Sequence, residues 1–148
     1  MAGRTQSTAV VAAAPQAVLA TISDFEAYPQ WASSVQECEV LGRDGHGRAE
    51  RVRFVLAAGV LKDTYVLRYA WDVTAAGTGA VSWTLETATL VTALDGAYRL
   101  APAAGGGTEV THELAVALRL PLLGALKRKA EKTIIDTALR ELGQRAGN

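Results

Sequence analysis

The residues of this chain best suited to chemistry are a histidine, an acid and a tyrosine on expected strands. Alternation places His112 on the inward face of one strand, and Asp63 and Tyr65 on the inward face of another. If they line one cavity, an imidazole, a carboxylate and a phenol can exchange protons with a substrate, so these three are the candidate catalytic residues. The sequence does not say that His112 meets the other two. A lone inward histidine is also more often a satisfied core residue, and His46 fits an exposed turn.

Other kinds of site find no support in the residues present. One cysteine, Cys38, and two distant histidines do not supply the ligands of a zinc site, so no metal is expected. The glycines at 105–107 lack the lysine and serine of a phosphate-binding loop, and no Gly-x-Ser-x-Gly motif occurs. We therefore expect neither a metal nor a cofactor, and whether the chain is an enzyme stays open.

Large side chains with polar tips gather on one face of the expected strands. Period-two alternation assigns seven residues to that face: Phe54, Tyr65, Tyr69, Trp71, Trp83, Tyr98 and His112. Such a set can fill a core without any ligand. A buried hydroxyl or indole N–H without a partner costs about 1–3 kcal/mol, however, so a core built only for stability would favour aliphatic residues and Phe. We therefore favour a ligand-binding pocket, to which the expected helices add Trp31, Leu126 and Ile134.

Turn residues and alternating hydrophobicity predict the strands that carry these side chains. The expected strands cover residues 5–13, 35–41, 49–57, 61–74, 81–90, 92–101 and 108–118. A short helix over 15–23 opens at Pro15, and a second short helix has Pro29 in its first turn. Connections this short predict an antiparallel meander.

The last stretch, from Leu122 to about Arg145, is expected to form one long helix. Its apolar residues recur every three or four positions, while most of its charges, Glu131 among them, are assigned to the other side. At ~1.5 Å per residue the helix would be roughly 35 Å long, about the diameter of a small domain. It must therefore lie across the sheet, and a sheet curled around a helix can enclose space.

Composition limits the possible partners. The chain has 148 residues, 49% of them hydrophobic, and a formal net charge of +0, so we expect a single domain over residues 1–148 and no nucleic-acid partner. A basic cluster at 127–132 reads as a solvated helix face rather than a membrane-docking patch. The lone Cys38 and the lack of a long apolar run suit a cytoplasmic protein. Monomer and homodimer both remain open.

Several short motifs, in this order and spacing, resemble those of a known superfamily. The motifs are Ala14-Pro15, the segment from Asp24 to Trp31, Tyr69-x-Trp71, Val81-Ser82-Trp83, Gly96-Ala97-Tyr98, Gly107 to Thr111, and the closing amphipathic helix. They resemble the START/Bet v 1-like (SRPBCC) superfamily, and within it the bacterial polyketide cyclase/dehydrase and lipid-transport type family. The resemblance implies an α+β helix-grip fold: a curved antiparallel sheet of about seven strands around a long C-terminal helix, with two short helices after the first strand.

The resemblance leaves two functions open. Similar proteins include lipid and sterol carriers, quinone-binding proteins and hormone receptors as well as aromatase/cyclases, and fold alone does not choose among them. Our first hypothesis is binding or transport of a lipid-like or polycyclic molecule between the sheet and the C-terminal helix. The alternative is a polyketide cyclase or dehydratase that uses His112, Asp63 or Tyr65. The arginines that such cyclases use to orient substrate are expected to point outward here, which weakens the alternative.

Overall fold

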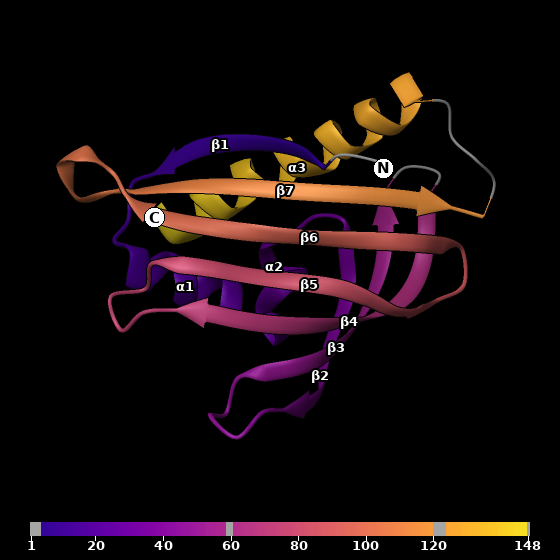
Figure 1. Cartoon of the computed structure of the whole chain (residues 1–148), viewed down its shortest axis with the longest axis horizontal. Helices are drawn as coiled ribbons and strands as arrows, with labels where there is room; N and C mark the ends of the chain where they lie inside the picture. Colours follow the sequence, from indigo (N-terminus) through magenta and orange to yellow (C-terminus); the bar gives the residue numbers. More distant parts are fainter. Residues whose placement is uncertain (1–3, 59–60, 120–123, 148) are drawn as a thin grey trace.

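The protein consists of one curved antiparallel sheet that wraps around a long helix (Figure 1). The computed structural model describes residues 4–58, 61–119 and 124–147. The strands are β1 (Thr5–Val11), β2 (Val35–Arg43), β3 (Ala49–Ala58), β4 (Leu61–Val73), β5 (Gly79–Ala88), β6 (Val91–Pro102) and β7 (Thr108–Leu118). The helices are α1 (Pro15–Ser23), α2 (Tyr28–Trp31) and α3 (Gly124–Gly147), with 3-10 turns η1 (Phe25–Ala27) and η2 (Ala104–Gly106). This confirms the predicted α+β helix-grip fold.

The strands follow one another as a meander, except for the first. Their order in the sheet is β1-β7-β6-β5-β4-β3-β2, so β1 lies at one edge and pairs with the last strand. Register shifts interrupt the β2–β3, β4–β5 and β6–β7 pairs. Such irregularities bend strands and increase their twist, and here they accompany the curvature that gives the sheet a concave face.

The two short helices close one end of the concave face. Pro15 and Pro29 stand in the first turns of α1 and α2, where a missing N–H costs nothing. The Tyr28 hydroxyl donates to the Ile22 carbonyl (2.6 Å) and fixes the bend between the helices. The β4–β5 turn packs against this unit at Gly77, where an added Cβ would lie 2.5 Å from the Gln16 nitrogen. The turn therefore requires a glycine.

Helix α3 lies across the concave face and buries Ile135, Leu139 and Leu142 (Figure 1). The expected first residues of this helix, from Leu122, fall outside the described residues. One assignment was wrong: Glu131 is fully buried rather than on the solvated side. It accepts hydrogen bonds from the Thr5 hydroxyl (2.6 Å) and the Val116 N–H (2.7 Å), and it pairs with Lys127. These donors compensate for the loss of water around the carboxylate.

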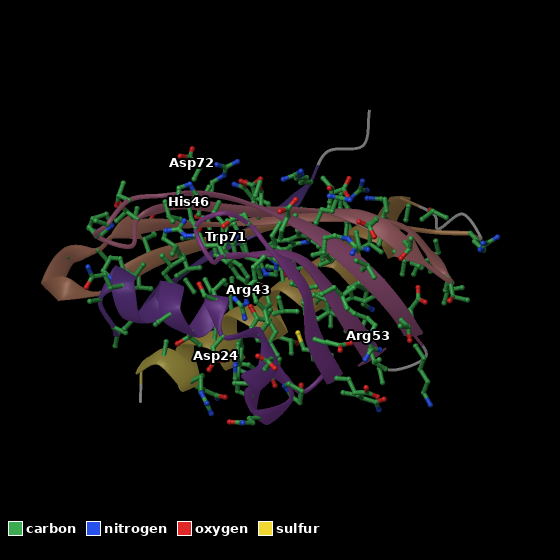
Figure 2. The ribbon with its side chains drawn as sticks, turned by 90° about the horizontal axis from the view of Figure 1, so that it is seen from below. Asp24, Arg43, His46, Arg53, Trp71 and Asp72 are labelled. Carbon is green, nitrogen blue, oxygen red and sulfur yellow. The ribbon has the colours of Figure 1, made fainter. Side chains whose placement is uncertain are left out.

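Charged residues cover the convex face of the sheet. The guanidinium groups of this face form ion pairs from one strand to another: Arg51 and Arg68 with Glu86, Arg53 with Glu37 and Glu39, and Arg99 with Glu113. In the view of Figure 2 the helices lie on one side of the sheet, and Asp72 projects on the opposite side. The arginines thus point outward, as expected from alternation.

Candidate functional site

A cavity of about 190 Å³ lies between the sheet and α3. Aliphatic side chains such as Val81, Leu100 and Leu142 fill the space beside α1, and none of them lines the cavity. Eight of the residues expected to contact a ligand do line it: Trp31, Phe54, Tyr65, Tyr69, Trp83, Tyr98, His112 and Ile134. The concave face is therefore solid at one end and hollow at the other.

A second depression is larger but less suited to a ligand. A groove of about 610 Å³ runs along the outer side of β1 and the C-terminal half of α3. Its described lining contains no aromatic side chain, and it is more open than the cavity beneath α3. Apolar ligands favour enclosed, aromatic-lined sites, so we take the cavity as the candidate functional site.

Strand pairing brings the aromatic rings of the cavity together. Phe54 faces Tyr65 across β3 and β4, with ring centroids 5.4 Å apart, and Tyr69 faces Trp83 across β4 and β5 at 5.8 Å. The Trp83 ring also lies 5.5 Å from that of Tyr98. Because directly paired residues share one face of a sheet, the register alone arranges these rings as a continuous wall.

Gly96 makes room for the Trp83 indole. The two residues are partners across β5 and β6, and an added Cβ on Gly96 would lie 2.6 Å from Cζ2 of the indole. The same Cβ would lie 2.5 Å from the carbonyl oxygen of Glu113. A side chain at this position would therefore displace both the cavity wall and the β6–β7 ladder. A glycine within a strand is the signal that indicates such a close approach.

The hydroxyls of three cavity tyrosines have no hydrogen-bond partner within the described part of the chain. They belong to Tyr65, Tyr69 and Tyr98, whereas the Tyr28 hydroxyl is bonded to a backbone carbonyl. Burial raises the pKa of all three phenols well above the ordinary value of 10.0. These groups are therefore protonated at physiological pH, and each can donate to a molecule in the cavity.

His112 is buried against Tyr98 at the cavity wall. The residue is 4% exposed, and its ring stacks on the Tyr98 ring with centroids 4.4 Å apart. Nδ1 of His112 has no hydrogen-bond partner in the described residues and is itself shielded from solvent. Burial lowers the pKa of His112 to about 4, although the nearby Ile135 carbonyl opposes this effect. The imidazole is therefore neutral at physiological pH.

Asp63, the third candidate catalytic residue, does not line the cavity with His112. Its carboxylate accepts backbone N–H bonds from Thr64 (2.8 Å), Thr89 (3.0 Å), Leu90 (2.9 Å) and Val91 (2.8 Å). Burial raises the pKa of Asp63, but these four bonds outweigh burial and bring the pKa below the ordinary value of 3.8. Asp63 thus holds the β5–β6 turn in place rather than facing a substrate.

Trp71 and Leu126 were also expected to contact a ligand, and neither lines the cavity. Trp71 lies nearer α1 (Figure 2). Its indole N–H donates to the Ala49 carbonyl (2.7 Å), and the Arg48 guanidinium carbon lies 5.7 Å from the centroid of its ring. Leu126 is 55% exposed on the first turns of α3. Alternation and helical periodicity identify a face, but the position along that face decides which residues meet the cavity.

The cavity opens between α3 and the segment that joins α2 to β2. Thr133, Thr137 and Glu141 contribute the α3 side of this mouth, and sequence reasoning did not include them. The Glu141 carboxylate accepts the Ser33 N–H (3.1 Å), which ties the two sides together. One turn further on, Arg145 donates to Gln30 (3.2 Å). The only sequence signal for this mouth was the break in helix pattern before Val35.

Comparison with protein families supplies the identification. The profile of the family described as polyketide cyclase / dehydrase and lipid transport matches residues 2–147. The chain belongs to this family. Its members include proteins with either activity in that description, so membership supports ligand binding or cyclase chemistry without choosing between them. Comparison with curated protein sequences finds no match.

Solved structures share the family fold along nearly the whole chain. A START superfamily protein from Mycobacterium smegmatis has a TM-score of 0.89 at 21% identity, covering 98% of this chain and 97% of that one. The Zhui aromatase/cyclase from Streptomyces sp. R1128 has a TM-score of 0.73 at 17% identity, covering 97% and 92%. A STAR-related lipid transfer protein from Xanthomonas axonopodis has a TM-score of 0.70 at 18% identity, covering 97% and 85%. At these identities the similarity shows the fold alone.

Proposed function

We propose that this chain binds and carries a hydrophobic small molecule in the cavity between its sheet and α3. The observation that carries the proposal is the cavity beneath α3, whose wall consists of paired aromatic rings with unpartnered polar tips. Empty apolar space under a helix costs stability, because a cavity forfeits the contacts that side chains would make. A ligand restores those contacts. The family description, which includes lipid transport, agrees with this role.

A variant that fills the cavity tests the proposal. Ala138 lies on the cavity side of α3, so Ala138→Phe places a ring in the space that a ligand would occupy. Ala125 is exposed on the same helix, and Ala125→Phe is the matched control. Native mass spectrometry of freshly purified protein, with organic extraction, measures what is bound. We expect a co-purified hydrophobic molecule in the parent and in the control, and none in Ala138→Phe. Equal occupancy in both variants would place the ligand elsewhere.

The enzyme alternative rests on His112 and Tyr98, which are stacked within the cavity. A neutral imidazole beside a protonated phenol has the groups of an acid/base pair, and a cyclase or dehydratase needs such a pair. Tyr65 lines the same cavity, but Asp63 is occupied by four backbone N–H groups. Returning the extracted molecule to the protein separates the two roles. A carrier leaves the molecule chemically unchanged, whereas an enzyme converts it to a product that differs in chromatographic retention or in mass, and His112→Ala slows the conversion.

Membrane docking through the basic part of α3 has less support. Lys127 pairs with the buried Glu131, and Lys132 pairs with Asp136 (2.9 Å). In the described residues no helix is both long and apolar enough to cross a bilayer. Arg128 and Lys129 remain exposed. Co-sedimentation with anionic and neutral vesicles tests this role, and we expect no dependence on lipid charge.

A further inference from the structure

The walls of the cavity define the charge of the molecule that fits inside. The described lining contains no lysine, arginine or aspartate. Its tyrosines are protonated, and its one histidine is neutral because burial lowers the pKa of His112 to about 4. The single acid, Glu141, lies at the mouth and accepts the Ser33 N–H. A carboxylate or phosphate group placed inside would lose its hydration without gaining a counter-charge, so an anionic ligand is disfavoured.

The volume of the cavity restricts the size of the ligand. An apolar cavity of ~150 Å³ is large enough to hold benzene. The cavity of about 190 Å³ beneath α3 is only slightly larger and therefore suits one ring or two fused rings. A long acyl chain would have to extend out through the mouth or displace the wall. Size thus favours a compact ring system over a lipid tail.

The shape and polarity of the wall match the same class of molecule. The rings of Tyr69, Trp83 and Tyr98 succeed one another across β4, β5 and β6 at centroid separations of 5.8 and 5.5 Å. Offset stacking or edge contact with an aromatic ligand adds stabilisation beyond the burial of area. The Tyr65, Tyr69 and Tyr98 hydroxyls have no partner in the described residues and are donors. Such donors are matched by a ligand with a hydroxyl or carbonyl oxygen.

We propose that the ligand is an uncharged aromatic compound of one or two rings that carries a hydroxyl or carbonyl group for the cavity tyrosines. This inference rests on the proposed function, because it names the ligand class of the same cavity. It excludes fatty acids, ring carboxylates and linear lipid alcohols as preferred ligands. Burial of the ring supplies most of the binding free energy and ring stacking adds to it, while the tyrosine hydroxyls select the oxygenated ring over the plain hydrocarbon.

Four probes separate charge, shape and hydrogen bonding. Equilibrium dialysis at pH 7.5 measures the Kd of 2-naphthol, 2-naphthoate, naphthalene and 1-dodecanol for the purified full chain. We expect 2-naphthol to bind at least about tenfold more tightly than 2-naphthoate and 1-dodecanol. We expect 2-naphthol to bind about fivefold more tightly than naphthalene, because one net hydrogen bond contributes about that factor to the Kd.

Removal of the hydroxyls tests where that advantage arises. The variants Tyr65→Phe, Tyr69→Phe and Tyr98→Phe each delete one hydroxyl and keep the ring, and the triple variant deletes all three. We expect the ratio of naphthalene Kd to 2-naphthol Kd to fall to about one in the triple variant. Trp71→Phe alters an aromatic residue outside the cavity and is the control, in which the ratio stays at the parent value. An unchanged ratio in the triple variant would overturn the role of the tyrosines.

Other outcomes distinguish failure of this inference from failure of the proposed function. Tightest binding of 2-naphthoate or 1-dodecanol would overturn the uncharged-ring class while the carrier function stands. If no probe binds, the molecule extracted from purified protein decides: a neutral one- or two-ring compound supports the inference, and a charged or long-chain compound overturns it. If no probe binds and nothing is extracted, both the inference and the proposed function fail.

Discussion

Tyr98 and His112 face each other across β6 and β7, with ring centroids 4.4 Å apart and an angle of 27° between the ring planes. In this stack the imidazole packs at the cavity wall, and its Nδ1 has no hydrogen-bond partner within the described residues. Burial keeps the histidine neutral in the folded protein, because the charged imidazolium would lose its hydration. This relationship links the stability of the fold to pH.

We predict that stability falls as the pH is lowered from about 6.5 towards 4, because of His112. Burial places the folded pKa of His112 at about 4, below the ordinary value of 6.5, so the unfolded chain binds the proton first. The free energy of unfolding should therefore drop by on the order of 3 kcal/mol over this range. His112→Gln should remove most of this slope. Urea unfolding at a series of pH values measures it, and an equal slope in the variant would contradict the assignment.

We predict that Asp63 stabilises the fold and takes no part in any chemistry. Asp63→Asn replaces one carboxylate oxygen by an NH2 group, which cannot accept a hydrogen bond, so not all four backbone N–H groups keep an acceptor. The free energy of unfolding should fall by about 3 kcal/mol. Asp72→Asn, on the exposed convex face of the same strand, is the matched control and should change it by less than about 0.5 kcal/mol (Figure 2). Equal effects of the two changes would refute this role.

We predict that Glu131 anchors α3 to the sheet. Glu131→Gln leaves Lys127 without its carboxylate and disturbs the bonds from Thr5 and Val116, so we expect a loss of about 3 kcal/mol in the free energy of unfolding. The comparison is Asp136→Asn, which removes an exposed acid from the same helix and should cost less than about 1 kcal/mol. Hydrogen exchange in the N-terminal half of α3 should rise only in the Glu131 variant.

We predict that substitution of Trp83 weakens ligand binding, whereas substitution of Trp71 on the neighbouring strand lowers stability alone. Trp83→Ala removes a ring of the cavity wall and should weaken binding of 2-naphthol at least about tenfold. Trp71→Phe loses the hydrogen bond to Ala49 and should cost about 1 kcal/mol of stability without changing that affinity. Circular dichroism establishes that both variants are folded before dialysis. Weakened binding in Trp71→Phe would mean that the ligand reaches the α1 end of the sheet.

We predict that a side chain at position 96 disrupts the cavity wall. Gly96→Ala places a Cβ against the Trp83 indole and the Glu113 carbonyl, and overpacking of this kind costs about 1–3 kcal/mol. Gly42→Ala is the control, because an added Cβ there meets no atom within 4 Å. The midpoint of thermal unfolding should fall clearly only in Gly96→Ala. The same midpoint for both variants would show that β6 adjusts without cost.

The sequence by itself determined the strands, the long helix and the face on which the aromatic side chains lie. Alternation and helical periodicity are local properties, since successive side chains of a strand point to opposite faces. Tyr69, Trp83, Tyr98 and His112 were assigned to the concave face from this pattern alone, and the register places them there. The short motifs, taken together in their order and spacing, indicated the family that the profile match confirms.

Only the tertiary structure decided which of these residues form a site. Trp71 and Trp83 share one face, yet the packing of α1 and η1 covers Trp71 and leaves Trp83 at the cavity. The Asp63 carboxylate accepts hydrogen bonds from backbone N–H groups of a turn 26 to 28 residues later in the chain. Glu131 is buried because β1 and β7 bring donors to α3 from 126 and 15 residues away. Contacts between distant segments leave no periodic signal in the sequence. These contacts decide which side chains are buried, which acids are ionised and which residues a ligand can reach.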